Sequence, residues 1–202
     1  MDTDPEPVLI EGLTLWLSAL AGDDPVDPDL IETSVEISRP IDGGVDVLRQ
    51  FNASIGYSTR SGPDEIGIVS GWIGWGIDDE DLLDAADAIS SDAEQLGAAA
   101  AEIIDAHPDA LIDNVLLIDR MHLVPRWRGN RMAGVIVADL LSLLRLDVAS
   151  TVVVLQPEPQ ASTGGPINDG PERDKALARL TSAYRASGLE PWRQSVVWWL
   201  PI

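Results

Sequence analysis

The residues with the clearest chemical meaning lie in segment 122–134, which reads His-Leu-Val-Pro-Arg-Trp-Arg-Gly-Asn-Arg-Met-Ala-Gly. Pro125 ends a run of β-forming residues, and an apolar helical pattern begins near Arg131. Such a turn exposes the first backbone N–H groups of the helix, at the positive end of its dipole. Gly129 lets the backbone approach a ligand closely, and the three arginines supply forked donors suited to phosphate. The segment predicts an anion-binding turn; the alternative is a tight loop whose arginines pair with acidic residues elsewhere.

The same segment resembles the phosphate motif of the GNAT superfamily, the acyl-CoA-dependent N-acyltransferases. That motif has Gln or Arg, two residues, Gly, one residue, and then Gly or Ala, after a strand that ends in Val-x-Pro or similar. Arg128 fits the first position and Ala133 the last, whereas Arg131 stands where the family usually has glycine. Residues 184–189, Tyr-Arg-Ala-Ser-Gly-Leu, resemble the family's late tyrosine motif, with Leu189 in place of phenylalanine. The resemblance covers residues 115–202, and over residues 30–77 it rests on strand order only.

The resemblance implies a role for each matching position. Backbone amides of the turn would hold the pyrophosphate of acetyl-CoA or another acyl-CoA, the arginines would add charge, and the end of the strand would pair with the pantetheine arm. The residues concerned are Leu123, Val124, Arg126, Arg128, Gly129, Asn130, Arg131, Met132 and Ala133. Tyr184 would protonate the departing CoA thiolate. The alternative for Tyr184 is a tyrosine that packs an amphipathic helix onto the sheet.

The family also needs a group that takes a proton from the substrate amine. Our candidate is Asp119, on the strand that leads to the turn. Regular alternation along that strand would put Asp119, Met121 and Leu123 on one face and His122 on the other. His122 is a second candidate because its ordinary pKa suits proton transfer near neutrality. Asp119 could instead pair with a neighbouring arginine or N–H group.

Composition excludes several other kinds of chemistry. The chain has no cysteine and two histidines, so thiolate sites and a histidine-rich metal cluster are excluded, and no metal cofactor is expected. Neither a Gly-x-Ser-x-Gly motif nor a Walker-type phosphate loop is present. No apolar run approaches the roughly 20 residues that cross a bilayer. With an acidic start at Met1 and no signal-like segment, we expect a cytoplasmic protein that binds no membrane.

The charge of the chain is large and unevenly shared. The formal net charge is -21, which opposes binding to nucleic acid. Residues 1–119 hold 27 Asp and Glu against three Arg and no Lys, whereas residues 120–202 carry a small positive balance. One interpretation is solubility. The other is that the acidic half collects a cationic acceptor, such as an amine on a small molecule or peptide.

The pattern of apolar residues predicts the elements that must position these groups. We expect strands at residues 34–38, 45–58 and 65–77 as an antiparallel meander, then helix over 78–106 that is split near Ser90. After these come a strand at 115–124, a helix at 131–146, a buried strand at 150–155, a helix at 173–187 capped by Gly188, and a strand at 194–200. An apolar segment at 8–20 fits a short helix. Trp198 and Trp199 would point to opposite faces of the last strand, leaving one for a second subunit of a homodimer.

These elements predict one mixed α/β domain over residues 1–202, with a mostly antiparallel central sheet flanked by helices. Residues 78–113 form a helical insertion relative to a minimal GNAT domain. The expected function is N-acyl transfer, most simply acetyl transfer, by direct attack of an amine on the thioester. Two alternatives stay open: a GNAT-like domain that binds acyl-CoA without catalysis, and an unrelated α/β protein with an anion-binding turn.

Overall fold

The structure is a computed structural model, and it describes residues 27, 30–38, 47–60, 62–77, 79–128, 132–161 and 165–201. Its centre is a seven-stranded sheet in the order β1-β2-β3-β4-β5-β7-β6. The strands are β1 (Ile31–Ile37), β2 (Arg49–Thr59), β3 (Gly62–Trp75), β4 (Asn114–Leu123), β5 (Thr151–Leu155), β6 (Glu190–Pro191) and β7 (Trp198–Trp199). The expected helix at residues 8–20 lies outside the described residues.

The first four strands form an antiparallel meander, and β4 and β5 are the parallel pair of the sheet. A parallel neighbour requires a crossover, which α4 (Met132–Leu143) provides between β4 and β5. The short strand β7 then pairs with both β5 and β6 in antiparallel fashion. The mixed, mostly antiparallel sheet expected from the sequence is confirmed.

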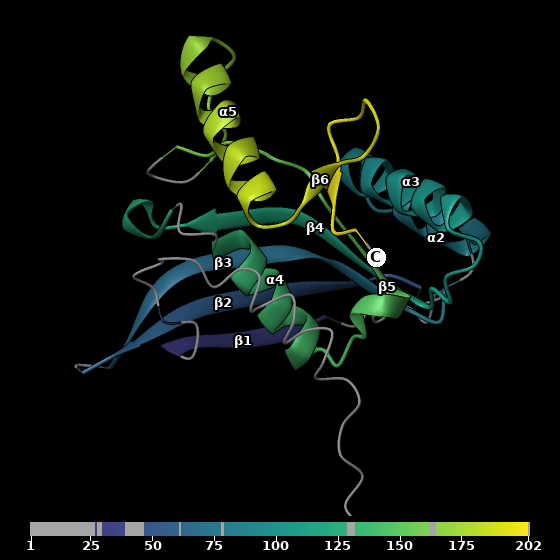
Figure 1. Ribbon diagram of the computed structural model, residues 1–202, viewed down its shortest axis with the longest axis horizontal. Helices are drawn as coiled ribbons and strands as arrows, with labels where there is room; N and C mark the ends of the chain where they lie inside the picture. Colours follow the sequence, from purple (N-terminus) through teal and green to yellow (C-terminus); the bar gives the residue numbers. More distant parts are fainter. Residues whose placement is uncertain are drawn as a thin grey trace, which may run out of the picture.

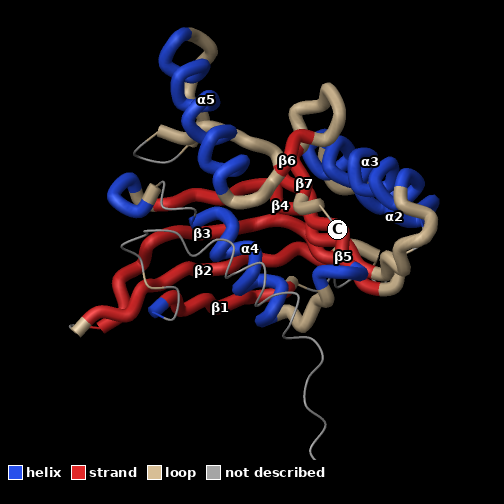
Figure 2. The backbone as a smooth tube through the Cα atoms, viewed as in Figure 1, coloured by secondary structure: helices blue, strands red, loops and turns tan. Residues whose placement is uncertain are grey.

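Helices cover both faces of the sheet, as Figures 1 and 2 show. On one face α4 crosses the strands, and the end of α5 (Pro171–Ala186) packs beside it through Tyr184. On the other face α2 (Asp79–Asp87) and α3 (Ser91–Ala106) cover the β4–β5 part of the sheet. The expected helical insertion between β3 and β4 is therefore the cover of one sheet face.

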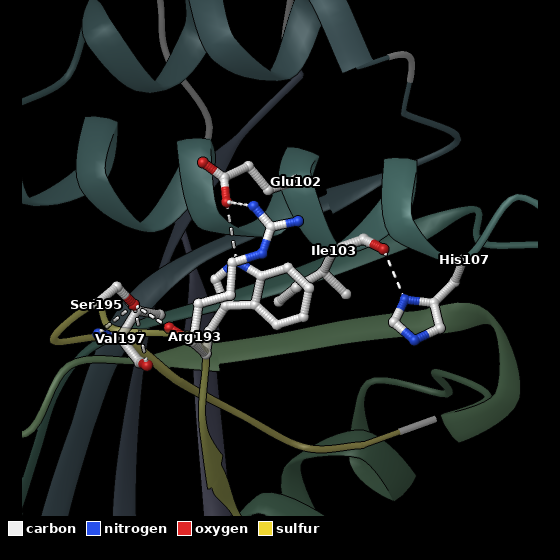
Figure 3. Close-up of polar contacts among 7 residues, drawn as sticks. Glu102, Ile103, His107, Arg193, Ser195 and Val197 are labelled. Atoms are coloured by element: carbon white, nitrogen blue, oxygen red, sulfur yellow. Dashed lines mark hydrogen bonds and ion pairs between the residues drawn. The ribbon is translucent and has the colours of Figure 1, made fainter.

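The α2–α3 pair is split at Ser90, as its sequence predicts. The Ser90 side chain accepts a hydrogen bond from the N–H of Ala93 at 3.1 Å, which caps the first turn of α3. At the other end His107 closes the helix, with its Nδ1 atom 2.8 Å from the carbonyl oxygen of Ile103 (Figure 3). Leu82 of α2 and Leu96 of α3 are both fully buried, so the two helices share one apolar cluster.

Alternation along the central strands divides the core into two clusters. Leu116 and Ile118 of β4 pack on the α4 side, whereas Val115 and Leu117 pack on the α3 side. All five residues of β5 are buried, as expected for a strand covered on both faces. The two-sided core is thus a direct result of helices lying on both faces.

The tryptophans of β7 divide in the same way, Trp198 on the α4 side and Trp199 on the α3 side. Both are less than 10% exposed, so the expectation that one of them faces a second subunit is wrong. Trp198 meets the ring of Tyr184 edge to face at 6.0 Å between centroids. Trp199 meets Trp192 in the same manner at 5.4 Å. Helices α2 and α3 provide the surface that buries Trp199, in place of a second subunit.

The final strand is shorter than the sequence predicts. Residues 192–197 form a tight turn in which the Ser195 hydroxyl donates to the carbonyl oxygen of Trp192 at 2.7 Å. The Ser195 hydroxyl oxygen also accepts from the N–H of Val197 at 3.1 Å (Figure 3). Glu102 of α3 holds this turn, because its carboxylate accepts from Trp192 Nε1 at 3.1 Å and from Arg193 at 2.9 Å. Among the described residues, no helix combines the length and the apolar character needed to cross a membrane.

Candidate functional site

The first half of β4 pairs with the whole length of β5. Their pairing ends where Ile118 lies opposite Leu155, and β4 then continues to Leu123 while the chain leaves β5 at Gln156. The second half of β4 therefore has β3 on one edge and, in the part of the chain that the structure describes, no strand on the other. An unpaired strand edge presents free N–H and C=O groups, which suit an extended ligand that carries amides.

A β-bulge marks the point where the two strands part. Gly71 of β3 lies opposite Ile118, and the preceding Ser70 lies opposite Arg120, so Asp119 is the extra residue of β4. The extra residue shifts the alternation of side chains beyond it. Met121 and Leu123 consequently pack on the same side as Ile118, toward α4. The expectation of uninterrupted alternation, with Asp119 on the face of Met121 and Leu123, is wrong for this reason.

The backbone of the open edge belongs to Met121 and Leu123. The N–H of Val124 donates to the carbonyl oxygen of Ile66 on β3 at 2.9 Å. Successive residues of a strand direct their backbone groups to opposite edges. Leu123 and Met121 therefore direct theirs toward the open edge, and Val124 does not. The expectation that Val124 offers its backbone N–H to a ligand is not met, because β3 already uses that group.

A cavity of about 490 Å³ occupies the space beside this edge. Its walls come from the end of β4, the start of α4, the chain after β5 and one face of α5. The lining residues are Met121, His122, Leu123, Pro125, Arg128, Ala133, Glu158, Pro159, Gln160, Ala176, Arg179, Leu180, Ala183 and Tyr184. The walls are mostly apolar with a few charged groups, which is the usual character of a small-molecule site.

Tyr184 is a buried residue of the cavity wall. Its side chain is 3% exposed and belongs to the core cluster on the α4 side. Burial raises the pKa of its phenol far above the ordinary value of 10. The phenol is therefore protonated at neutral pH, as a proton donor must be. Tyr184 packs the helix, as one of its two alternatives predicts, and it also lines the cavity, so its role as a proton donor stays a prediction.

The arginines of the turn take different positions. Arg126 forms an exposed ion pair with Asp64 at 3.1 Å and is absent from the cavity walls. Arg128 lines the cavity, and its Nε donates to the carbonyl oxygen of Leu123 at 2.8 Å. The pairing of turn arginines with acidic residues thus holds for Arg126, while Arg128 points to the open edge.

The helix that follows the turn begins at the cavity. Met132 opens α4 and is buried in the core, and Ala133 lines the cavity one residue later. The first backbone N–H groups of α4 therefore lie at the cavity wall, where an anionic group would meet the positive end of the helix dipole. Gly129, Asn130 and Arg131, which the sequence also assigns to the site, lie outside the described residues.

The two candidate bases are separated by the bulge. His122 lines the cavity, whereas Asp119 is not among its walls. Burial raises the pKa of the Asp119 carboxyl; Arg120 opposes that rise, and the charge of Asp92 at the start of α3 adds to it. Of the two candidates, His122 is the one that lines the cavity, and alternation with Met121 and Leu123 directs its side chain toward the opposite, α3 face of the sheet.

Sequence reasoning missed several of the lining residues. Glu158 and Gln160 come from the loop after β5, and Arg179 comes from the cavity face of α5. The helical spacing of Ala176, Leu180 and Ala183 does predict a common face. Nothing in that spacing identifies the other elements that close the cavity.

Comparisons of the chain with protein-family models, with curated proteins and with solved structures found no match. The fold and site define the class of this protein by themselves. It is a mixed α/β protein with an open, mostly antiparallel seven-stranded sheet, whose single parallel pair parts to form a ligand-sized cavity.

Proposed function

We propose that this protein is an acyl-CoA-dependent N-acyltransferase of the GNAT kind. One observation carries the proposal: the cavity brings together the open edge of β4, the start of α4 and Tyr184. These are the three places to which the sequence resemblance assigns the pantetheine arm, the pyrophosphate and the proton donor. The sheet order, with the β4–β5 pair as its parallel step, agrees with that resemblance.

The pantetheine arm is a chain with two amides, and an open strand edge is suited to such a chain. Met121 and Leu123 would pair with the arm, since their backbone groups face the cavity. Apolar side chains of α5, including Leu180 and Ala183, would cover its methylene groups. Arg128 and Arg179 would supply positive charge for the phosphates, beside the N–H groups at the start of α4.

The reaction joins an uncharged amine to the acyl carbon of the thioester. The nitrogen lone pair attacks that carbon, the C–S bond breaks, and the sulfur leaves with the bonding electrons. Tyr184 would give its proton to the sulfur, and His122, directly or through water, would take one from the amine nitrogen. Most of the rate enhancement would come from holding the two reactants together in a fixed orientation.

The second candidate function is binding of acyl-CoA without catalysis. The position of Asp119 favours it, because the candidate carboxylate base lies outside the cavity walls. Binding alone would need the open edge and the anion site, and neither Tyr184 nor a base would matter for it.

Ligand binding is tested first, by thermal unfolding with and without CoA. A ligand at about 100 times its dissociation constant adds roughly 2.7 kcal/mol to the free energy of unfolding. For a chain of this length that corresponds to a rise in Tm of about 5 to 11 °C. A folded protein whose Tm does not change at millimolar CoA would reject both candidate functions.

Turnover then separates the two candidates. Release of free thiol from acetyl-CoA is followed in the presence of a panel of amines, including polyamines and basic peptides chosen because residues 1–119 are acidic. Thiol release that depends on the amine supports the acyltransferase. CoA binding with no release for any amine supports the binding module.

A further inference from the structure

The side chain of Arg128 occupies a backbone acceptor on the open edge of β4. Its Nε donates to the carbonyl oxygen of Leu123 at 2.8 Å, across five residues of chain. That carbonyl faces the cavity, because the neighbouring Val124 directs its N–H to Ile66 on the opposite edge. A ligand that adds to β4 as an extra strand would donate an N–H to the oxygen that Arg128 already occupies.

Arg128 also lies where an anion would attract it. It shares the cavity wall with Ala133, in the first turn of α4. Among the described residues no carboxylate forms an ion pair with Arg128, in contrast to Arg126, which Asp64 holds at 3.1 Å. A planar guanidinium binds a phosphate through two parallel hydrogen bonds, and this interaction is stronger than one bond to a neutral carbonyl.

We infer that Arg128 determines which ligands enter the cavity, by exchanging the Leu123 carbonyl for an anionic group of the ligand. A neutral amide chain has to displace the guanidinium from the Leu123 carbonyl, and it offers the guanidinium no anionic group in exchange. A chain that carries phosphate at one end draws the guanidinium away and so frees the edge for its own amides. The inference rests on the proposed function, and it makes the cavity selective for amide chains attached to an anion.

The two halves of CoA separate these effects. Pantetheine carries the amide chain without the phosphates, and 3′,5′-ADP carries phosphates without the chain. Removal of the Arg128 side chain in Arg128→Ala should tighten pantetheine binding and weaken 3′,5′-ADP binding, each by roughly threefold to tenfold, the range of one typical hydrogen bond. Tighter binding of pantetheine is the decisive sign, since loss of the Arg128 charge alone would weaken only 3′,5′-ADP, and loss of packing would weaken both fragments.

The experiment measures dissociation constants of CoA, pantetheine and 3′,5′-ADP by calorimetry for the wild-type protein, Arg128→Ala and the control Arg145→Ala. Arg145 is exposed beyond the far end of α4, so its removal changes the net charge equally without touching the cavity. The control should leave all three constants unchanged. A crystal structure of the CoA complex should show Arg128 on a phosphate and more than 3.5 Å from the Leu123 oxygen.

Pantetheine binding to Arg128→Ala that is unchanged or weaker overturns the inference, whatever happens to 3′,5′-ADP. CoA binding to the wild-type protein would still leave the proposed function intact. Failure of CoA to bind the folded wild-type protein overturns the proposed function, and the inference with it.

Discussion

A Cβ atom on Gly71 would stand 2.0 Å from the carbonyl oxygen of Leu117 on the neighbouring strand. Gly71 lies opposite Ile118, directly beside the bulge at Asp119. A side chain at Gly71 would therefore collide with the backbone of β4 at the point where β4 parts from β5, and only glycine fits there. The position of the open edge depends on this contact.

Substitution Gly71→Ala should destabilise the protein by about 1 to 3 kcal/mol, because a backbone carbonyl cannot move aside as a side chain can. Any relaxation must shift β4 against β3, so CoA affinity should also fall. The matched control is Gly56→Ala on β2, where the nearest atom to the new Cβ would lie at 3.4 Å. Chemical denaturation and calorimetry of the two variants test this, and equal stability of both would show that the close approach is not required.

Replacement of Tyr184 by phenylalanine tests the proton donor. The phenyl ring keeps the edge-to-face contact with Trp198, so the fold and CoA affinity should be retained. If Tyr184 protonates the thiolate, kcat should fall at least tenfold, since general acid catalysis typically contributes about 10²–10⁴-fold. An unchanged KM would place the loss in the transition state. Full activity of Tyr184→Phe would leave this residue with a packing role and assign the proton to another donor.

The position of the bulge predicts which candidate takes the proton from the amine. His122→Ala should lower kcat/KM by at least tenfold at pH 7, with the loss reduced at high pH, where more of the amine is uncharged before it binds. Asp119 does not line the cavity, so Asp119→Asn should retain most of the activity. Rate measurements across pH 6–9 on both variants distinguish His122 from Asp119 as the proton acceptor. The reverse result, with Asp119→Asn the slower enzyme, would mean that Asp119 acts through water.

Asp119 should instead affect stability in a manner that depends on pH. Burial raises the pKa of its carboxyl above the ordinary value of 3.8, so the folded protein holds this proton more firmly than the unfolded chain does. The stability that this proton provides is present below pH 3.8 and is lost as the pH rises through the raised pKa.

At pH 7 the Asp119→Asn variant should therefore be more stable than the wild-type protein, and the difference should shrink as the pH approaches 4. Urea unfolding at several pH values measures it, with the exposed Asp105→Asn variant as the control for loss of one negative charge. A variant less stable than the wild type at pH 7 would show that the Asp119 carboxylate has a favourable partner.

The sequence by itself determined most of the described elements and their order, though not β6 or the shortness of the final strand. Apolar periodicity located the meander, the split helix at Ser90, the buried strand of residues 151–155 and the amphipathic helix that carries Tyr184. These are local properties, because a side-chain period of two or of 3.6 residues is set by the backbone conformation of each segment. The turn before α4, for which we predict an anion site, is located in the same way, from Pro125 and the apolar run that follows it.

Only the tertiary structure decided how these elements face one another. The bulge at Asp119 depends on the register of β4 against Gly71, and one extra residue there reversed the alternation on which the Asp119 assignment rested. Likewise, Trp198 and Trp199 point to opposite faces as the period requires. Burial of Trp198 depends on α4 and the end of α5, and burial of Trp199 depends on α2 and α3, none of which a local pattern places.

The different partners of Arg126 and Arg128 likewise depend on the tertiary structure. The two residues have equal charge and lie two positions apart, yet one pairs with Asp64 on a distant hairpin and the other with the Leu123 carbonyl. Residue type and spacing determine what a side chain can bind. Which partner it binds depends on distances across the fold, because hydrogen bonds and ion pairs act over a few ångströms between segments that lie far apart in the chain.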